Sequence, residues 1–73
     1  MTLKTHADHW LAQLFAAKAV ANGGVIRRDR RWVRREIGKE RFIAEVRQRG
    51  FHLIEAGEQW LVICTASPLR RLC

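Results

Sequence analysis

The highest density of reactive side chains in this sequence is a run of arginines between positions 27 and 35. Guanidinium groups make paired hydrogen bonds to phosphate oxygens and to the O6 and N7 edge of guanine. Like charges this close repel one another, and a bound anion would relieve the repulsion. We therefore predict phosphate contacts here, with simple solvation as the alternative. Six of these nine residues are arginine: Arg27, Arg28, Arg30, Arg31, Arg34 and Arg35.

A second set of candidate contacts lies on the stretch that follows. If Phe42, Ile43 and Val46 face a core, a period of 3.6 residues per turn leaves the opposite helix face exposed. Arginine on such a face can address guanine, glutamine can address adenine, and alanine can meet the thymine methyl group. An ordinary solvated helix face is the alternative. The candidate contacts on this helix are Lys39, Arg41, Ala44, Glu45, Arg47 and Gln48.

The composition favours a small basic protein with an anionic partner. The 73 residues suffice for one domain, spanning 1–73, and 48% are hydrophobic, which is too many for a disordered tail. Lys and Arg number 14 against seven Asp and Glu, giving a net charge of +7, and eleven of the 14 are arginine. This charge suits nucleic acid or an acidic protein surface.

We expect no catalytic or metal site and no cofactor. Cys64 and Cys73 lack metal-ligand spacing, and His6 and His9 have no further ligands nearby in the sequence. Cys64 falls within a predicted strand, where a nucleophile would not be exposed. No apolar run approaches the about 20 residues of a membrane span, and no signal peptide is recognisable, so we expect a cytoplasmic protein.

The helices that would hold the candidate contacts have recognisable boundaries. Thr5 and Asp8 have the spacing of a capping box, which predicts a helix over His9–Ala21, ended by Asn22-Gly23-Gly24. Within this helix, Ala17 and Ala21 should extend the core-facing side that begins at Trp10. The GGVIRR segment predicts a short strand. Asp29 should cap the next helix, which meets a second one at Gly38, and that second helix should end at Gly50. Trp10 and Trp32 are expected to pack in the core.

The C-terminal third predicts a β-hairpin. FHLIEA and QWLVICT are β-runs, and Gly57 suits the first position of a two-residue type II′ turn. This register pairs Leu53 with Val62 and Glu55 with Trp60. One face should cover the helices, and the other should meet a further element or form a dimer contact. Ser67-Pro68 predicts a short helical turn through the final LRRLC.

At this point the chain resembles the winged helix-turn-helix family, over roughly Trp10 to Thr65. The resemblance rests on the order helix, strand, helix, helix, strand, strand, with two short helices meeting at Gly38. It implies an α+β fold, sequence-specific binding to double-stranded DNA and a role as a small transcriptional regulator, with a possible homodimer through the hairpin. The short turn carrying Glu58 implies that the wing adds little affinity.

The blocks GGVIRR and EVRQRGF and the final arginine pair also resemble small uncharacterised bacterial proteins, some of them labelled phosphoribosylanthranilate isomerase. That enzyme is a (β/α)₈ barrel, which needs about 200 residues or more, so we expect no such activity. Two alternatives remain. The basic face could dock an acidic partner such as a region of RNA polymerase, or the arginine run could bind RNA.

Overall fold

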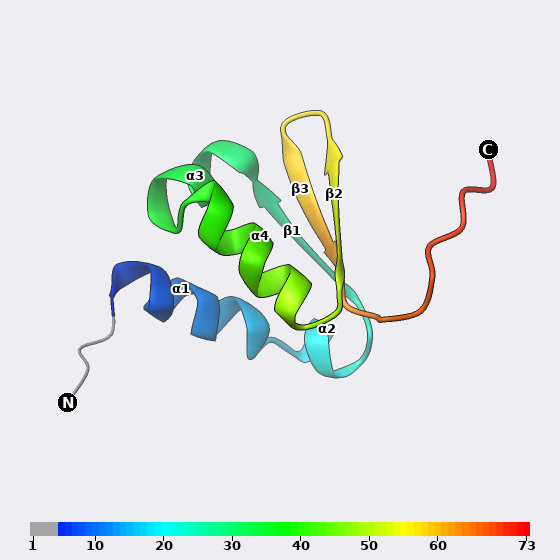
Figure 1. Ribbon diagram of the computed structural model, residues 1–73, viewed down its shortest axis with the longest axis horizontal. Coiled ribbons are helices and arrows are strands. Elements are labelled where there is room, and N and C mark those ends of the chain that lie inside the picture. The colour runs from blue at the N-terminus through cyan, green and yellow to red at the C-terminus, as the bar shows by residue number, and fades with distance from the viewer. Residues whose placement is uncertain (1–4) are drawn as a thin grey trace.

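In the computed structural model of this chain, residues 5–73 are described, apart from the side chain of Ala19 (Figure 1). The first four residues, part of the N-terminus in which no signal peptide was recognised, lie outside the described residues. The chain forms a small α+β fold. Its elements are α1 (His6–Phe15), α2 (Lys18–Ala21), β1 (Val25–Asp29), α3 (Arg30–Glu36), α4 (Lys39–Gln48), β2 (His52–Ala56) and β3 (Gln59–Ile63).

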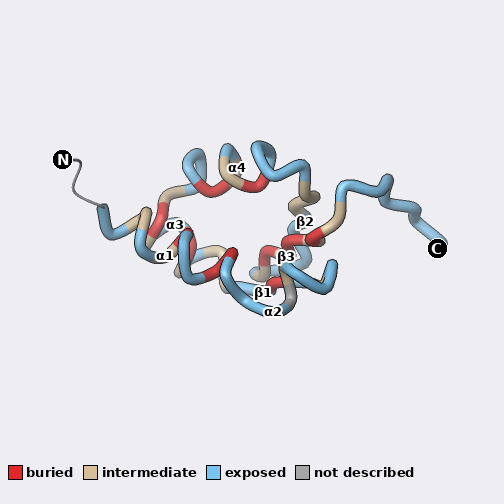
Figure 2. Tube along the Cα trace, turned by 90° about the horizontal axis from the view of Figure 1, so that it is seen from below, coloured by how far each residue is buried: buried red, intermediate tan, exposed pale blue. Residues whose placement is uncertain are grey.

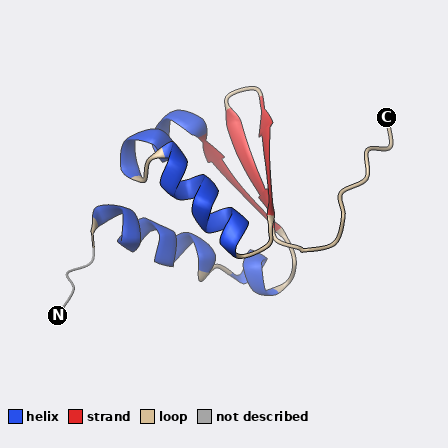
Figure 3. Ribbon diagram, in the orientation of Figure 1, coloured by secondary structure: helices blue, strands red, loops and turns tan. Residues whose placement is uncertain are grey.

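The strands form one antiparallel sheet in the order β1-β3-β2 (Figure 3). The hairpin register is as predicted, with Leu53 opposite Val62 and Glu55 opposite Trp60. Gly57, the first residue of the two-residue turn, has a φ of 61°. Glu58, the second, has no positive φ, and this combination fits a type II′ turn. β1 pairs with the other side of β3, and Ile26 lies opposite Val62.

The N-terminal helix is shorter than predicted and starts earlier. The capping box of Thr5 and Asp8 is present, but α1 ends at Phe15, and Ala17 is extended, with ψ 152°. Phe15 and Val20 both pack against the core. Five residues of a continuous helix would turn them about 140° apart, so a break is needed to bring both inward. Consequently Ala17 and Ala21 are exposed, and the prediction that they extend the inner face is wrong.

The core lies between the sheet and the three longer helices (Figure 2). Phe42 of α4 is 1% exposed and stacks on Trp60 of β3, with the ring centroids 6.0 Å apart. Trp10 and Trp32 join α1 to α3 edge to face, with centroids 5.0 Å apart. The buried residues are Leu11, Leu14, Phe15, Ile26, Val33, Ile37, Phe42, Val46, Trp60, Val62 and Cys64.

Residues 64–73 form no helix or strand, so the predicted C-terminal helical turn is wrong. Fewer than two turns rarely form a helix without tertiary packing, and Leu72 has none, being 86% exposed. The chain instead leads away from the domain after a contact of 2.7 Å between His52 Nε2 and the Ser67 carbonyl oxygen (Figure 1). Burial raises the pKa of the Cys64 thiol, which disfavours the reactive thiolate.

Candidate nucleic-acid interface

The two helices of the candidate site are held at a fixed turn. The Asp29 carboxylate accepts hydrogen bonds from the backbone N–H groups of Arg31 and Trp32, at 2.8 and 3.3 Å, and so starts α3 as predicted. α3 ends at Glu36, and only Ile37 and Gly38 separate it from α4. Gly38 has φ 101° and ψ 137°, a backbone conformation that is essentially restricted to glycine.

α4 packs one side on the core and leaves the other exposed. Phe42 and Val46 are buried, whereas Ala44, Arg47 and Gln48 on the opposite side are exposed. Ala44 lies at the centre of that surface. Because its side chain is only a methyl group, another molecule could approach the helix backbone closely there. This exposed side of α4 also carries Glu40, a residue that the sequence analysis did not include. Its place opposite Phe42 could have been found from the same helical period.

Two of the predicted contacts on α4 are occupied by partners within the chain. Arg41 forms an ion pair with Asp8 of α1, a residue 33 positions away. Glu45 pairs with Arg49 at 3.1 Å, one turn along the helix. Both pairs are on the side of α4 next to α1, because Arg49 also lies 4.2 Å from the ring of Phe15. A ligand of Arg41 would have to compete with the Asp8 carboxylate.

Lys39 and Arg47 are the cations of α4 without such a partner. Both are exposed, and neither has a carboxylate in ion-pair contact within residues 5–73. Lys39 borders a shallow hollow next to Leu53, Glu55 and Trp60, between the start of α4 and the hairpin. The positive charge of α4 that no described carboxylate pairs with therefore lies on the side of the helix toward β2.

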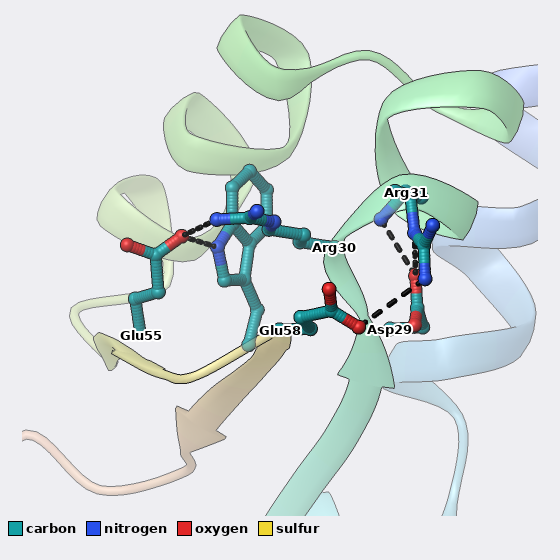
Figure 4. A network of polar contacts seen from close by, with 6 residues as sticks. Asp29, Arg30, Arg31, Glu55 and Glu58 are labelled. Carbon is teal, nitrogen blue, oxygen red and sulfur yellow. Dashed lines mark hydrogen bonds and ion pairs between the residues drawn. The ribbon is translucent and has the colours of Figure 1, made fainter.

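Half of the arginine run is already neutralised inside the chain. The Arg30 guanidinium lies 3.3 Å from Glu55, and that of Arg31 lies 3.2 Å from Glu58 (Figure 4). Arg35 pairs with the neighbouring Glu36 at 3.3 Å. The repulsion expected from the sequence is thus relieved in part by acids from the hairpin. No carboxylate pairs in the described part with Arg27, Arg28 or Arg34.

These contacts attach the hairpin to the first turn of α3. One carboxylate oxygen of Glu55 accepts hydrogen bonds from both Arg30 and the Trp60 indole N–H, at 3.3 and 3.0 Å (Figure 4). The backbone N–H of Arg30 also donates to the Glu58 carbonyl oxygen at 2.9 Å. Arg34 lies over the Trp60 ring, 5.8 Å from its centroid. The hairpin turn is therefore held against α3, and Glu58 cannot add positive charge to the site.

Arg27 is the member of the run that the structure separates from the helices. Side chains alternate along a strand, and Ile26 next to it is 5% exposed and faces the core. Arg27 is exposed on the opposite face of the sheet, beside Leu61 of β3. It is not brought together with the exposed side of α4.

Three carboxylates with depressed pKa values make the fold sensitive to acid. The pKa of Asp8 is lowered by hydrogen bonds from the Thr5 backbone and from Arg41. Hydrogen bonds from His6 and Arg35 lower the pKa of Glu36, and hydrogen bonds from Trp60 and Arg30 lower that of Glu55. A carboxylate with a lowered pKa in the folded state stabilises the fold above its unfolded pKa, and this stabilisation is lost as the pH falls.

We expect the urea midpoint to be constant from pH 7 to pH 5 and to fall below the ordinary glutamate pKa of 4.5. Circular dichroism at constant ionic strength measures this midpoint. The variant Asp8→Asn/Glu55→Gln, which cannot titrate at these positions, should show a shallower fall. An equal fall in both proteins would mean that general charge repulsion, rather than these carboxylates, causes the loss.

No protein-family model, curated protein or solved structure gives a significant match to this chain. In the part of the chain that the structure describes, no helix is long and apolar enough to cross a membrane, and no group of three acids, histidines or cysteines could hold a metal ion.

Proposed function

We propose that this chain is a small winged helix-turn-helix protein that binds double-stranded DNA through the exposed side of α4. The observation that carries the proposal is that this side is exposed and has a small residue, Ala44, at its centre, with Arg47 and Gln48 beside it. A helix with such a surface can enter the major groove, which is wide enough for one helix.

The order of elements supports the same assignment. A strand, two helices with two residues between them and a hairpin follow α1 and α2 in the chain. α4 would be the reading helix, with Gln48 suited to adenine and Arg41 to guanine once it leaves Asp8. The hairpin, with its two-residue turn, would be a short wing that supports α3 through Arg30 and Arg31 and makes no strong DNA contact.

The backbone contacts would come from the cations that no acid neutralises. Four of them lie on the inner face of the sheet or on α3 and α4: Arg28, Arg34, Lys39 and Arg47. If each neutralises one phosphate, the logarithm of the binding constant should fall with the logarithm of salt concentration with a slope of about −4. A cytoplasmic role in transcriptional regulation follows from this proposal.

Fluorescence anisotropy with labelled duplex DNA, duplex RNA and single strands, in a salt series, tests the proposal. We expect the tightest binding to duplex DNA, because the major groove of A-form RNA is too narrow for an inserted helix. Preference for RNA would point instead to an RNA-binding protein. Anisotropy that does not reach saturation with duplex DNA at physiological salt would leave no support for DNA binding.

Replacing Arg34 with alanine is expected to weaken binding to all duplex sequences alike and to make the salt slope shallower by about one. The reason is that Arg34 would contact phosphate, which carries no sequence information. Lys18→Ala on α2, an exposed cation on the opposite side of the molecule from α4, is the matched control and should leave the slope unchanged (Figure 2). Equal slopes for both variants would remove Arg34 from the interface.

A further inference from the structure

The outer face of the sheet carries five apolar side chains at nine positions and is largely uncovered, apart from the contact of His52 with the Ser67 carbonyl oxygen. Because side chains alternate along each strand, the residues next to the buried Ile26 and Val62 point away from the helices. None of the nine outer positions is fully buried, and Val25 and Ile54 are 51% and 38% exposed. The outer positions are Val25, Arg27, Asp29, His52, Ile54, Ala56, Gln59, Leu61 and Ile63.

The charged side chains of this outer face are Arg27 and Asp29, and they differ in whether they already have a partner. Arg27 lies in its middle row, across from Leu61 and Ile54, and no described carboxylate pairs with it. Asp29 is at the edge, but its carboxylate accepts the backbone N–H groups that start α3. A ligand of this face would therefore need apolar side chains and a negative charge beside Arg27, at the β1 edge of the sheet.

The C-terminal segment of the same chain does not meet that need. It carries two exposed leucines, but Arg70 and Arg71 lie between them and would be placed near Arg27. Like charges in apolar surroundings repel strongly. Figure 1 also shows this segment leading away from the sheet.

A second copy of the chain also fits this face poorly. Such a copy is what the homodimer predicted from the sequence would place on the hairpin. The face is three strands wide and five residues long, a footprint of about 17 by 14 Å, or roughly 240 Å². Two copies would bring Arg27 toward Arg27 and combine two net charges of +7.

We propose that the outer face docks a single acidic amphipathic helix of another protein. A helix of about 11 residues is about 16 Å long and about 10 Å wide, which matches the footprint. Its apolar stripe would lie on Val25, Leu61 and Ile63, and a glutamate or aspartate would pair with Arg27. This surface is on the other side of the core from the exposed side of α4, so the inference does not depend on DNA binding (Figure 2).

The test uses a synthetic 18-residue helical peptide with leucine at i, i+3, i+7 and i+10, glutamate at four positions beside this stripe, and alanine at the remaining positions. Titrated into the ¹⁵N-labelled chain, it should shift the amide resonances of β1, β2 and β3. The same peptide with lysine in place of glutamate should not bind. We expect Arg27→Glu to weaken binding at least tenfold, whereas Arg28→Glu, the same change at the neighbouring inner position, should weaken it far less.

A neutral variant separates this surface from the proposed DNA interface. Leu61→Gln should abolish peptide binding and leave duplex binding unchanged. Shifts confined to α4 would show that the peptide merely follows net charge, and would overturn the proposal. So would the absence of shifts, or outer-face shifts that depend on protein concentration without peptide, which would indicate a second copy.

Discussion

Replacing Phe42 with alanine is expected to remove most of the free energy of unfolding of this chain. The Phe42 ring is 1% exposed and lies between two other aromatic rings, 6.5 Å from Phe15 and 6.0 Å from Trp60. Removing a fully buried phenylalanine costs about 3–5 kcal/mol, because the transfer free energy is lost and a cavity remains. A domain of this size has a free energy of unfolding near the lower end of about 5–15 kcal/mol.

Far-UV circular dichroism and tryptophan fluorescence in a urea series measure this loss, and Trp60 reports directly because it stacks on the deleted ring. The control is Leu72→Ala, which also truncates an apolar side chain to alanine, but one that is 86% exposed, and it should leave the urea midpoint unchanged. A loss below about 1 kcal/mol for Phe42→Ala would contradict the central place of this residue in the core.

The substitution Ala44→Glu is expected to lower duplex affinity by about 5- to 150-fold, corresponding to about 1–3 kcal/mol. Ala44 is exposed at the centre of the outward side of α4, so glutamate fits the fold, and the helix propensities of the two residues differ little. In the proposed complex the new carboxylate would lie in the groove, near phosphates and the acceptor edges of bases. Anisotropy with labelled duplex at fixed salt gives the change.

Ala12→Glu is the matched control, because Ala12 is also an exposed alanine within a helix and the change in net charge is the same. It should lower affinity only slightly, through the reduced long-range attraction. Equal losses in the two variants would show that net charge alone matters and that α4 does not enter a groove. Urea midpoints of both variants establish that the fold is retained.

The element order and the strand register could be predicted because they depend on local patterns. Asp29 and Gly50 carry the backbone signals of a helix start and a helix end, and both act as expected. Alternating apolar residues around Gly57 determine the hairpin register, since a slip of one residue would turn Leu53 and Val62 away from the core. The helix break at Ala17 was missed because alanine favours helix locally, and only the packing of Phe15 and Val20 requires the break.

The sequence by itself determined the net charge, the position of the arginine run and the helix faces that carry the candidate contacts. Only the tertiary structure decided which cations remain without a partner, because an ion pair such as Arg41 with Asp8 or Arg30 with Glu55 joins residues far apart in the chain. The same is true of Arg27, whose side of the sheet depends on which neighbours the core buries. Helical and strand periods assign a residue to one face of its own element, and the packing of the elements then determines what that face meets.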